Sequence, residues 1–168
     1  GVKYSKVQEV VRFLRLSKNA KKVLKKLKSV GFRVIIVSIN DENIIRSFLS
    51  KNGISDYVDH IYAARLGVKN GLLTGEITGD VIRTEKVGIV SKIENLYGVK
   101  KNDIVYIGDG LTDLPIMKKV GRGILFCPNA VTNAEVLLDR ELMRMKNEGK
   151  LFLVEKRDLE RILPFVKS

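Results

Sequence analysis

The chain is poor in cysteine, histidine and proline, and it has no tryptophan. Its one cysteine, Cys127, cannot form a disulfide within the chain, and this fits a reducing, cytoplasmic environment. We expect Cys127 to be a small buried residue at the end of a strand rather than a reactive thiol. No apolar run approaches ~18 residues, so we expect no membrane-spanning helix.

Positive charge exceeds negative charge. There are 31 lysines and arginines against 19 aspartates and glutamates, a net charge of +12 that would suit nucleic acid or an acidic membrane. The densest group of lysines, however, lies on the polar side of one predicted helix, and no aromatic residue alternates with them as in surfaces that bind single strands. We therefore interpret it as a solvated helix face and expect neither partner. The group consists of Lys18, Lys21, Lys22, Lys25, Lys26 and Lys28.

Apolar residues make up 45% of the 168 residues, which is enough for one domain with a core. Strands are predicted at 32–37, 103–107, 123–126 and 151–154. The first contains the continuous apolar run 34–37, which is typical of a strand buried on both faces of a parallel sheet. Helices are predicted at 19–30, from Asn40 or Asp41 to Gly53, at 86–97, at 112–119, from Asn129 or Thr132 to about 146, and at 157–166. The helix at 86–97 is expected to bury Val90, Ile93 and Leu96. This alternation predicts an α/β fold with a doubly wound parallel sheet.

The segment 58–82 breaks this alternation. Asn70-Gly71 is a strong signal for a two-residue turn, because both central positions of such a turn favour positive φ. We predict a β-hairpin that projects from the main sheet.

Polar residues follow two of the predicted strands, at Ser38 and at Asp109. Ligands of open α/β sheets bind beyond the carboxyl ends of the strands. Asp109 stands in a Gly-Asp-Gly turn, and Asp113 lies near the start of the next helix. Two carboxylates so placed suit Mg²⁺, which binds one or two carboxylates together with phosphate oxygens and water. The alternative is that Asp113 caps the helix and Asp109 belongs to a tight turn.

The sequence Gly-Asp-Gly-Leu-Thr-Asp-Leu-Pro-Ile-Met at 108–117 resembles the fourth motif of haloacid dehalogenase phosphatases, in a form close to that of phosphoserine phosphatases. The strand ending at Ser38 resembles the second motif, and Lys86 resembles the third. The hairpin at 64–75 and the ending at 155–163 are also similar to that family, so the resemblance covers roughly residues 5 to 166.

The resemblance implies a Mg²⁺-dependent phosphomonoester hydrolase of serine biosynthesis that acts on a small phosphorylated metabolite, phosphoserine first. It implies that Asp109 is a Mg²⁺ ligand and that Asp113 supports the metal site or binds metal-bound water. By the same resemblance Lys86 is a cationic clamp, and Ser38 and the main-chain N–H of Ile39 donate to phosphate. Thr112 is implied to contact the substrate. Ile39 stands where the family often has Gly, and Thr112 where it often has Asn. A homodimer is left open.

The nucleophile motif of that family, Asp-x-Asp-Gly-(Thr/Ser), does not occur in these 168 residues. We expect an N-terminally truncated form that is inactive alone, with residues 1–15 a remnant of a helical cap and 16–168 the core domain. The central nucleophile strand would then be missing, and the strands ending at Ser38 and Asp109 would flank a gap. Three alternatives stay open: a non-catalytic module that senses phosphate or binds protein, a split enzyme, and a phosphatase of nucleic-acid ends.

Overall fold

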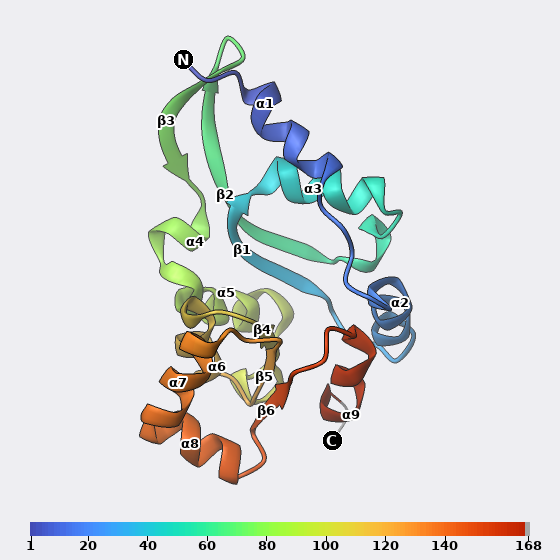
Figure 1. Ribbon diagram of the computed structural model, residues 1–168, viewed down its shortest axis with the longest axis vertical. Coiled ribbons are helices and arrows are strands. Elements are labelled where there is room, and N and C mark those ends of the chain that lie inside the picture. The colour runs from blue at the N-terminus through green and yellow to red at the C-terminus, as the bar shows by residue number, and fades with distance from the viewer. Residues whose placement is uncertain (167–168) are drawn as a thin grey trace. The chain divides into compact units, whose positions relative to one another are not determined.

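The computed structural model describes residues 1–166 and divides the chain into two compact units, Gly1–Glu85 and Lys86–Ser168 (Figure 1). Both units combine helices with parallel strand pairs, and the first adds an antiparallel hairpin, which confirms the predicted α/β fold. The division falls inside the region 16–168 that the sequence assigns to one core domain. The assignment of residues 1–15 to a cap stays a prediction.

The first unit is a three-stranded sheet with helices beside it. Strand β2 lies in the middle, between β1 and β3. Its helices and strands are α1 (Tyr4–Gln8), a 3₁₀ turn at Glu9–Arg12, α2 (Ala20–Ser29), β1 (Ile35–Asp41), α3 (Glu42–Lys51), a 3₁₀ turn at Ser55–Tyr57, β2 (His60–Lys69), β3 (Leu72–Thr78) and α4 (Asp80–Arg83).

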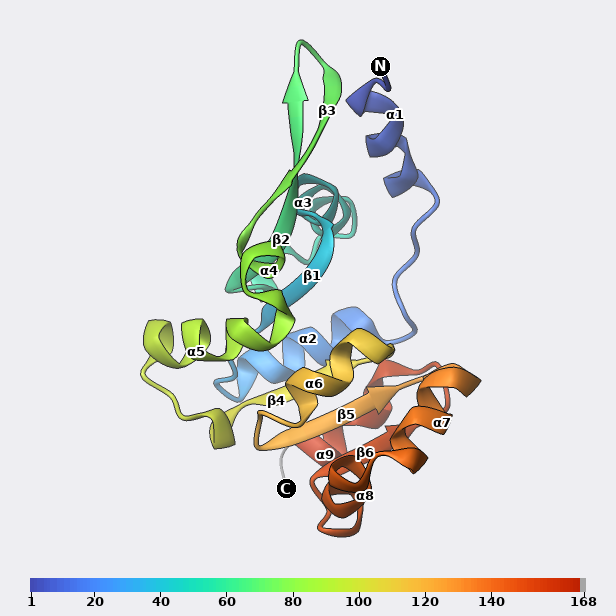
Figure 2. The same cartoon turned by 90° about the vertical axis from the view of Figure 1, so that its left-hand side faces the viewer.

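Strand β2 pairs with β1 along its first half and with β3 along its second half. Its first half runs parallel to β1, with Ile35 opposite His60, and its second half runs antiparallel to β3, with Lys69 opposite Leu72. The turn between β2 and β3 has positive φ at both central residues, Asn70 and Gly71. The predicted hairpin is therefore confirmed, and Figure 2 shows it extending beyond the part of β2 that pairs with β1.

Asp41 joins strand β1 to helix α3. Its side chain accepts hydrogen bonds from the N–H groups of Asn43 and Ile44, which are two of the unpaired donors at the start of the helix. The Tyr4 hydroxyl donates to the same carboxylate at 2.6 Å. Of the two caps that the sequence allows for this helix, the structure uses Asp41.

The second unit is a wholly parallel sheet in the order β4-β5-β6. It comprises α5 (Glu85–Tyr97), a 3₁₀ turn at Lys101–Asp103, β4 (Val105–Gly108), a 3₁₀ turn at Leu111–Asp113, α6 (Leu114–Met117), β5 (Arg122–Phe126), α7 (Ala130–Leu138), α8 (Arg140–Asn147), β6 (Leu151–Val154), a 3₁₀ turn at Leu159–Ile162 and α9 (Leu163–Val166).

The single helix predicted from Asn129 or Thr132 to about 146 is instead two helices, α7 and α8. Asn129 caps the first through a bond from the N–H of Thr132. Asp139 follows α7 in an extended conformation and caps α8, accepting from the N–H of Leu142 at 3.0 Å. The spacing of apolar residues alone indicates one continuous helix. Asp139 starts a new helix instead, because its side chain bonds to main-chain N–H groups.

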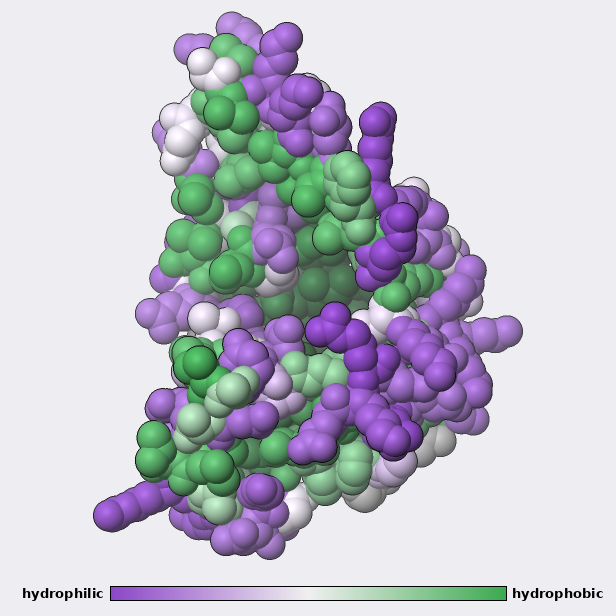
Figure 3. Space-filling model, in the orientation of Figure 1, coloured by the Kyte–Doolittle hydropathy of each residue, from purple (hydrophilic) through white to green (hydrophobic). Residues whose placement is uncertain are grey.

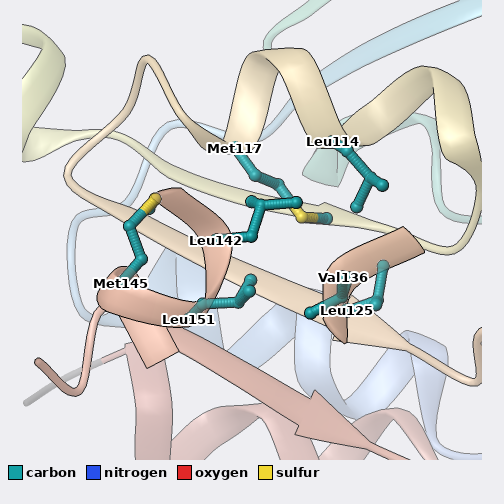
Figure 4. Close-up of a cluster of buried hydrophobic side chains, with 7 residues drawn as sticks. All are labelled: Leu114, Met117, Leu125, Val136, Leu142, Met145 and Leu151. Atoms are coloured by element: carbon teal, nitrogen blue, oxygen red, sulfur yellow. The ribbon is translucent and has the colours of Figure 1, made fainter. Parts of the chain in front are cut away.

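A buried apolar cluster joins α7 and α8 to the sheet of the second unit (Figure 4). It takes side chains from α6, β5, α7, α8 and β6, and it explains what the segment 130–150 does. That segment supplies three of the buried side chains, Val136, Leu142 and Met145. The full cluster is Leu114, Met117, Leu125, Val136, Leu142, Met145 and Leu151.

Four details of the sequence prediction are wrong. Strand β1 continues past Ser38 to Asp41, and Ile35–Val37 are only half-buried, because β1 is an edge strand with one neighbour in its sheet among the described residues. Leu96 is exposed, since α5 turns its buried face to Ile89, Val90 and Ile93 instead. Cys127 is partly exposed and has a positive φ just beyond β5.

The surface of the first unit carries a broad apolar area on the face that Figure 3 presents, over the hairpin and nearby elements. On the strands of the hairpin, the side chains of Val68, Leu72 and Ile77 are exposed. In the part of the chain that the structure describes, no helix combines the length and the apolar character needed to cross a membrane.

Shortening Leu142 tests whether α8 belongs to the core of the second unit. Its side chain is 0% exposed, whereas that of Leu138, at the end of α7, is 79% exposed. Leu142→Ala should lower the free energy of unfolding by about 2–5 kcal/mol, because it leaves a cavity. Leu138→Ala, the matched control, should change it by less than about 0.5 kcal/mol. Urea denaturation measures both, and equal effects would contradict the packing described.

Candidate active site

The candidate site lies where β4 ends. After Gly108 the chain makes the turn Asp109-Gly110 and enters the 3₁₀ turn Leu111–Asp113, which leads directly into α6. Pro115 stands in the first turn of α6, where its missing N–H costs no hydrogen bond. The two aspartates of the motif are thereby placed at the carboxyl end of a parallel strand, as the sequence predicts.

Asp113 is a buried carboxylate with four hydrogen-bond donors. Its Oδ1 accepts from Lys86 Nζ at 2.6 Å and from the Tyr106 hydroxyl at 2.8 Å. Its Oδ2 accepts from the main-chain N–H groups of Asp109 and Gly110, both at 3.0 Å. Because the side chain is nearly inaccessible to water, these bonds replace its hydration and fix the turn around it.

Lys86 reaches this carboxylate from the first turn of α5. Its ammonium group also donates to Thr112 Oγ1 at 3.2 Å, and the side chain is largely buried. The ion pair therefore holds a positive charge beside the Gly-Asp-Gly turn. Lys86, Thr112 and Asp113, which the sequence assigns to the site separately, lie together.

The environment keeps Asp113 ionised. Burial by itself would raise the pKa of Asp113, but the hydrogen bond from Lys86 and then those from Gly110 and the neighbouring tyrosine outweigh it, so that the pKa is lowered. Burial first, and then the charge of Asp113, raise the pKa of Tyr106. The tyrosine hydroxyl therefore stays protonated and serves as a donor.

Tyr106 is a site residue that the sequence analysis missed. It stands in the apolar strand β4 and packs against the core clusters of the second unit, while its hydroxyl reaches Asp113. The available signal was the residue type, because a tyrosine inside a buried strand needs a partner for its hydroxyl. Only the structure identifies that partner.

Gly108 is required by the close approach of Asp113. A Cβ atom at position 108 would lie 2.5 Å from Asp113 Cγ, closer than real atoms come. At Gly110, by contrast, the nearest atom to a Cβ would be Asp113 Oδ2 at 3.9 Å, an ordinary contact. The first glycine of the motif thus makes room for the buried carboxylate.

Asp109 differs from Asp113 in its surroundings. Its side chain is exposed, and among residues 1–166 no donor is within hydrogen-bond distance of its carboxylate. No cluster of three or more potential metal-ligating side chains occurs in that same range. A single available carboxylate at a strand end fits Mg²⁺, which takes its other ligands from phosphate and water. Asp113, with its four donors, suits the supporting role rather than direct coordination.

Ser38 and Ile39 belong to the first unit, in the last part of β1. The Oγ atom of Ser38 accepts a hydrogen bond from the N–H of Asn40 at 3.1 Å, which leaves the hydroxyl hydrogen for a ligand. The side chain of Ile39 is exposed. Their contribution to a phosphate site stays a prediction.

Comparison with known proteins gives a consistent result. A model of the haloacid dehalogenase-like hydrolase family matches residues 2–118. A phosphoserine phosphatase of Methanocaldococcus jannaschii is 31% identical over 163 residues, covering 96% of this chain and 69% of that protein. One of Streptococcus thermophilus is 29% identical, covering 80% of this chain and 61% of the relative. This protein therefore belongs to the haloacid dehalogenase-like hydrolase family.

Solved structures agree with the sequence comparison. A phosphoserine phosphatase in its apo form is 30% identical and superimposes with a TM-score of 0.78, covering 99% of this chain and 74% of that one. A substrate-bound phosphoserine phosphatase complex gives the same TM-score, with 71% of its chain covered. The chain thus spans about three quarters of these structures and about two thirds of the two curated relatives.

Adding one methyl group to either glycine of the motif tests the geometry of the site. Gly108→Ala should lower the free energy of unfolding by about 1–3 kcal/mol, because the new Cβ pushes against the carboxylate of Asp113. Gly110→Ala, the matched control, should change it by less than about 0.5 kcal/mol, since its backbone is extended and its surroundings are open. Thermal or urea unfolding compares the two; a larger loss at position 110 would refute the geometry.

The lowered pKa of Asp113 predicts a pH dependence of stability. A carboxyl group whose pKa is lower in the folded state stabilises fully above its ordinary value of 3.8, and this contribution is lost as the pH falls through the folded pKa. Asp113→Asn should therefore lower the free energy of unfolding by about 3 kcal/mol at neutral pH, and less below pH 3.8. Urea unfolding at several pH values measures this difference.

The control for this measurement is Asp56→Asn. Asp56 is an exposed carboxylate on the first unit without a hydrogen-bond or ion-pair partner among residues 1–166. Its substitution should leave the stability curve close to that of the unchanged protein. A difference between Asp113→Asn and the unchanged protein that grows as the pH falls would contradict an ionised, buried Asp113.

Proposed function

We propose that this protein is a Mg²⁺-dependent phosphomonoester hydrolase acting on a small phosphorylated metabolite, with phosphoserine as the first substrate to test. The observation that carries the proposal is the buried pair of Lys86 and Asp113 beside the available carboxylate of Asp109. A fixed positive charge next to a metal-binding carboxylate is what a phosphoryl group needs as its negative charge grows during transfer. The similarity to phosphoserine phosphatases supports the choice of substrate.

Each group has a role that its surroundings support. Lys86, whose Nζ lies 2.6 Å from Asp113 Oδ1, would place its ammonium charge against the phosphoryl oxygens. By the family resemblance, the Ser38 hydroxyl and the N–H of Ile39 would also donate to phosphate. The Thr112 hydroxyl, which accepts a bond from Lys86, would orient the ammonium group and contact the substrate.

Asp109 would hold the Mg²⁺ ion, and Asp113 would keep the turn that presents Asp109 in place. When bound, the ion would draw charge from the phosphoryl oxygens and so favour attack at phosphorus. Asp113 acts on this arrangement through its bonds to the N–H groups of Asp109 and Gly110.

The proposal also requires a nucleophile that these 168 residues do not contain in the family's form, Asp-x-Asp-Gly-(Thr/Ser). We propose that it comes from a segment of the same protein outside this sequence. The unpaired side of β1 and the unpaired side of β4, each at the edge of its own sheet among residues 1–166, are consistent with a further strand.

The test of this function is Asp109→Asn in the whole encoded protein. It should reduce Mg²⁺-dependent release of phosphate from phosphoserine by roughly 100-fold or more, because the metal loses its carboxylate ligand. Asp103→Asn is the matched control, since Asp103 precedes the same strand and only caps a turn there. Retention of full activity in Asp109→Asn would refute the assignment. A Mg²⁺-dependent rise in melting temperature, lost in Asp109→Asn, is the second readout.

A second candidate is a non-catalytic module that binds phosphate without hydrolysing it. The absence of the nucleophile motif from the sequence is the observation that favours it. Phosphate binding by the whole protein without turnover of any phosphomonoester would select this candidate, and turnover would exclude it.

A further inference from the structure

The first unit contains a pocket of about 420 Å³ that lies wholly within residues 42–83. It is formed at the base of the hairpin, between the start of α3, the middle of β2, the end of β3 and α4. Small-molecule sites of proteins have volumes of this order. Its principal polar lining residues are Glu42, Tyr62, Arg65, Thr78, Asp80 and Arg83.

The pocket presents two guanidinium groups, each tied to a carboxylate. Arg65 Nε donates to Glu42 Oε2 at 2.7 Å, and Arg83 donates to Asp80 Oδ1 at 2.7 Å through a terminal nitrogen. The pKa of Arg65 is raised, first by the bond to Glu42, then by its charge, and also by the charge of Asp80. One arginine is therefore within electrostatic reach of both carboxylates.

These ion pairs leave donors for a ligand. The Arg65 side chain is 69% exposed, and among residues 1–166 the sole acceptor of its guanidinium is Glu42, through Nε. Its two terminal nitrogens form the parallel pair of donors that matches a carboxylate. Arg83, 72% exposed, likewise uses one terminal nitrogen only.

Glu42 is a largely buried carboxylate in the lining of the pocket. Its side chain is 12% exposed and receives three hydrogen bonds, two from Arg46 on Oε1 and one from Arg65 on Oε2. A carboxylate offers about four lone-pair positions, so Oε2 retains capacity for a donor from a ligand. The pKa of Glu42 is lowered, because bonds from the two arginines outweigh the effect of burial.

The backbone fixes the shape of the pocket. Gly79, between β3 and α4, has φ of 110°, and a Cβ atom there would lie 2.3 Å from the carbonyl oxygen of Ala63 in β2. Only glycine permits this approach. The close approach of Gly79 to β2 therefore helps to define the pocket. Arg65 lies on β2 and Arg83 on α4, the helix that follows Gly79.

We propose that this pocket binds a small zwitterion of the α-amino acid class. The carboxylate of the ligand would lie against the free terminal nitrogens of Arg65 and Arg83, and its ammonium group against Glu42 and Asp80. Two cations and two anions line the pocket, so a simple anion meets repulsion from the carboxylates and a simple cation meets it from the arginines. A ligand that carries both charges finds a complement for each.

This inference goes beyond the proposed phosphatase and does not depend on it. None of the lining residues belongs to the group of Lys86, Asp109 and Asp113. Failure of amino acid binding would leave the phosphatase proposal untouched, and failure of the phosphatase assay would leave the pocket proposal untouched.

The experiment compares glycine and L-alanine with acetate and methylammonium, which each carry only one of the two charges. The whole protein, labelled with ¹⁵N, is titrated with each compound while the amide signals of residues 62–83 are followed. The amino acids should shift these signals with a dissociation constant tighter than roughly 10 mM, and the two fragments should bind at least about 10-fold more weakly. Absence of shifts with both amino acids, or equal binding of acetate, would overturn the proposal.

A pair of arginine variants locates the site. Arg65→Gln and Arg83→Gln should each weaken L-alanine binding by about 10-fold or more, since each removes a charged hydrogen bond. Arg33→Gln is the matched control, because Arg33 is similarly exposed and also forms a surface ion pair, with Asp59, outside the pocket. Unchanged binding in both pocket variants, with amide spectra that show a folded protein, would refute this location.

Discussion

The four hydrogen bonds accepted by the carboxylate of Asp113 hold the carboxyl end of strand β4 and the turn after it in place. They connect helix α5 through Lys86, strand β4 through Tyr106, and the Gly-Asp-Gly turn through two N–H groups. A buried charge is costly unless it is paired and fully hydrogen-bonded. Removing any one of these donors would therefore weaken the hydrogen bonds that the other donors make to Asp113. The turn, the lysine and the exposed Asp109 owe their arrangement to this one group.

The first unit repeats the same physical device with other residues. Glu42, at the start of α3, is largely buried and receives bonds from Arg46 and Arg65. In each unit a carboxylate shielded from water holds a cation near the surface in a fixed position. Such pairs contribute less to stability than their geometry suggests, because desolvation offsets the attraction. Their value is in placing charge, which is what binding an ionic ligand requires.

Local signals predicted most of the elements, and their failures have identifiable physical causes. The turn at Asn70-Gly71 follows from the backbone preferences of these two residues, and the cap at Asp41 follows from its side-chain acceptor; both are present. Asp139 divides a predicted helix because its side chain caps a new one. Leu96 is exposed although its spacing fits the buried face, because burial depends on which neighbours pack against α5. The spacing of apolar residues indicates which face of a helix is apolar. It does not indicate how much of that face other elements bury.

The sequence by itself determined the α/β class, the hairpin and the carboxylate-bearing turn, because these depend on residues close together in the chain. Only the tertiary structure decided which side chains pair with the buried carboxylates. Lys86 meets Asp113 across 27 positions, and the hydroxyl of Tyr106 completes the same carboxylate. Arg65 meets Glu42 across 23 positions. Charge pairing has no sequence period, since it arises only when separate elements pack, and for that reason the lysine–aspartate pair and the arginine-lined pocket could not be foreseen from spacing.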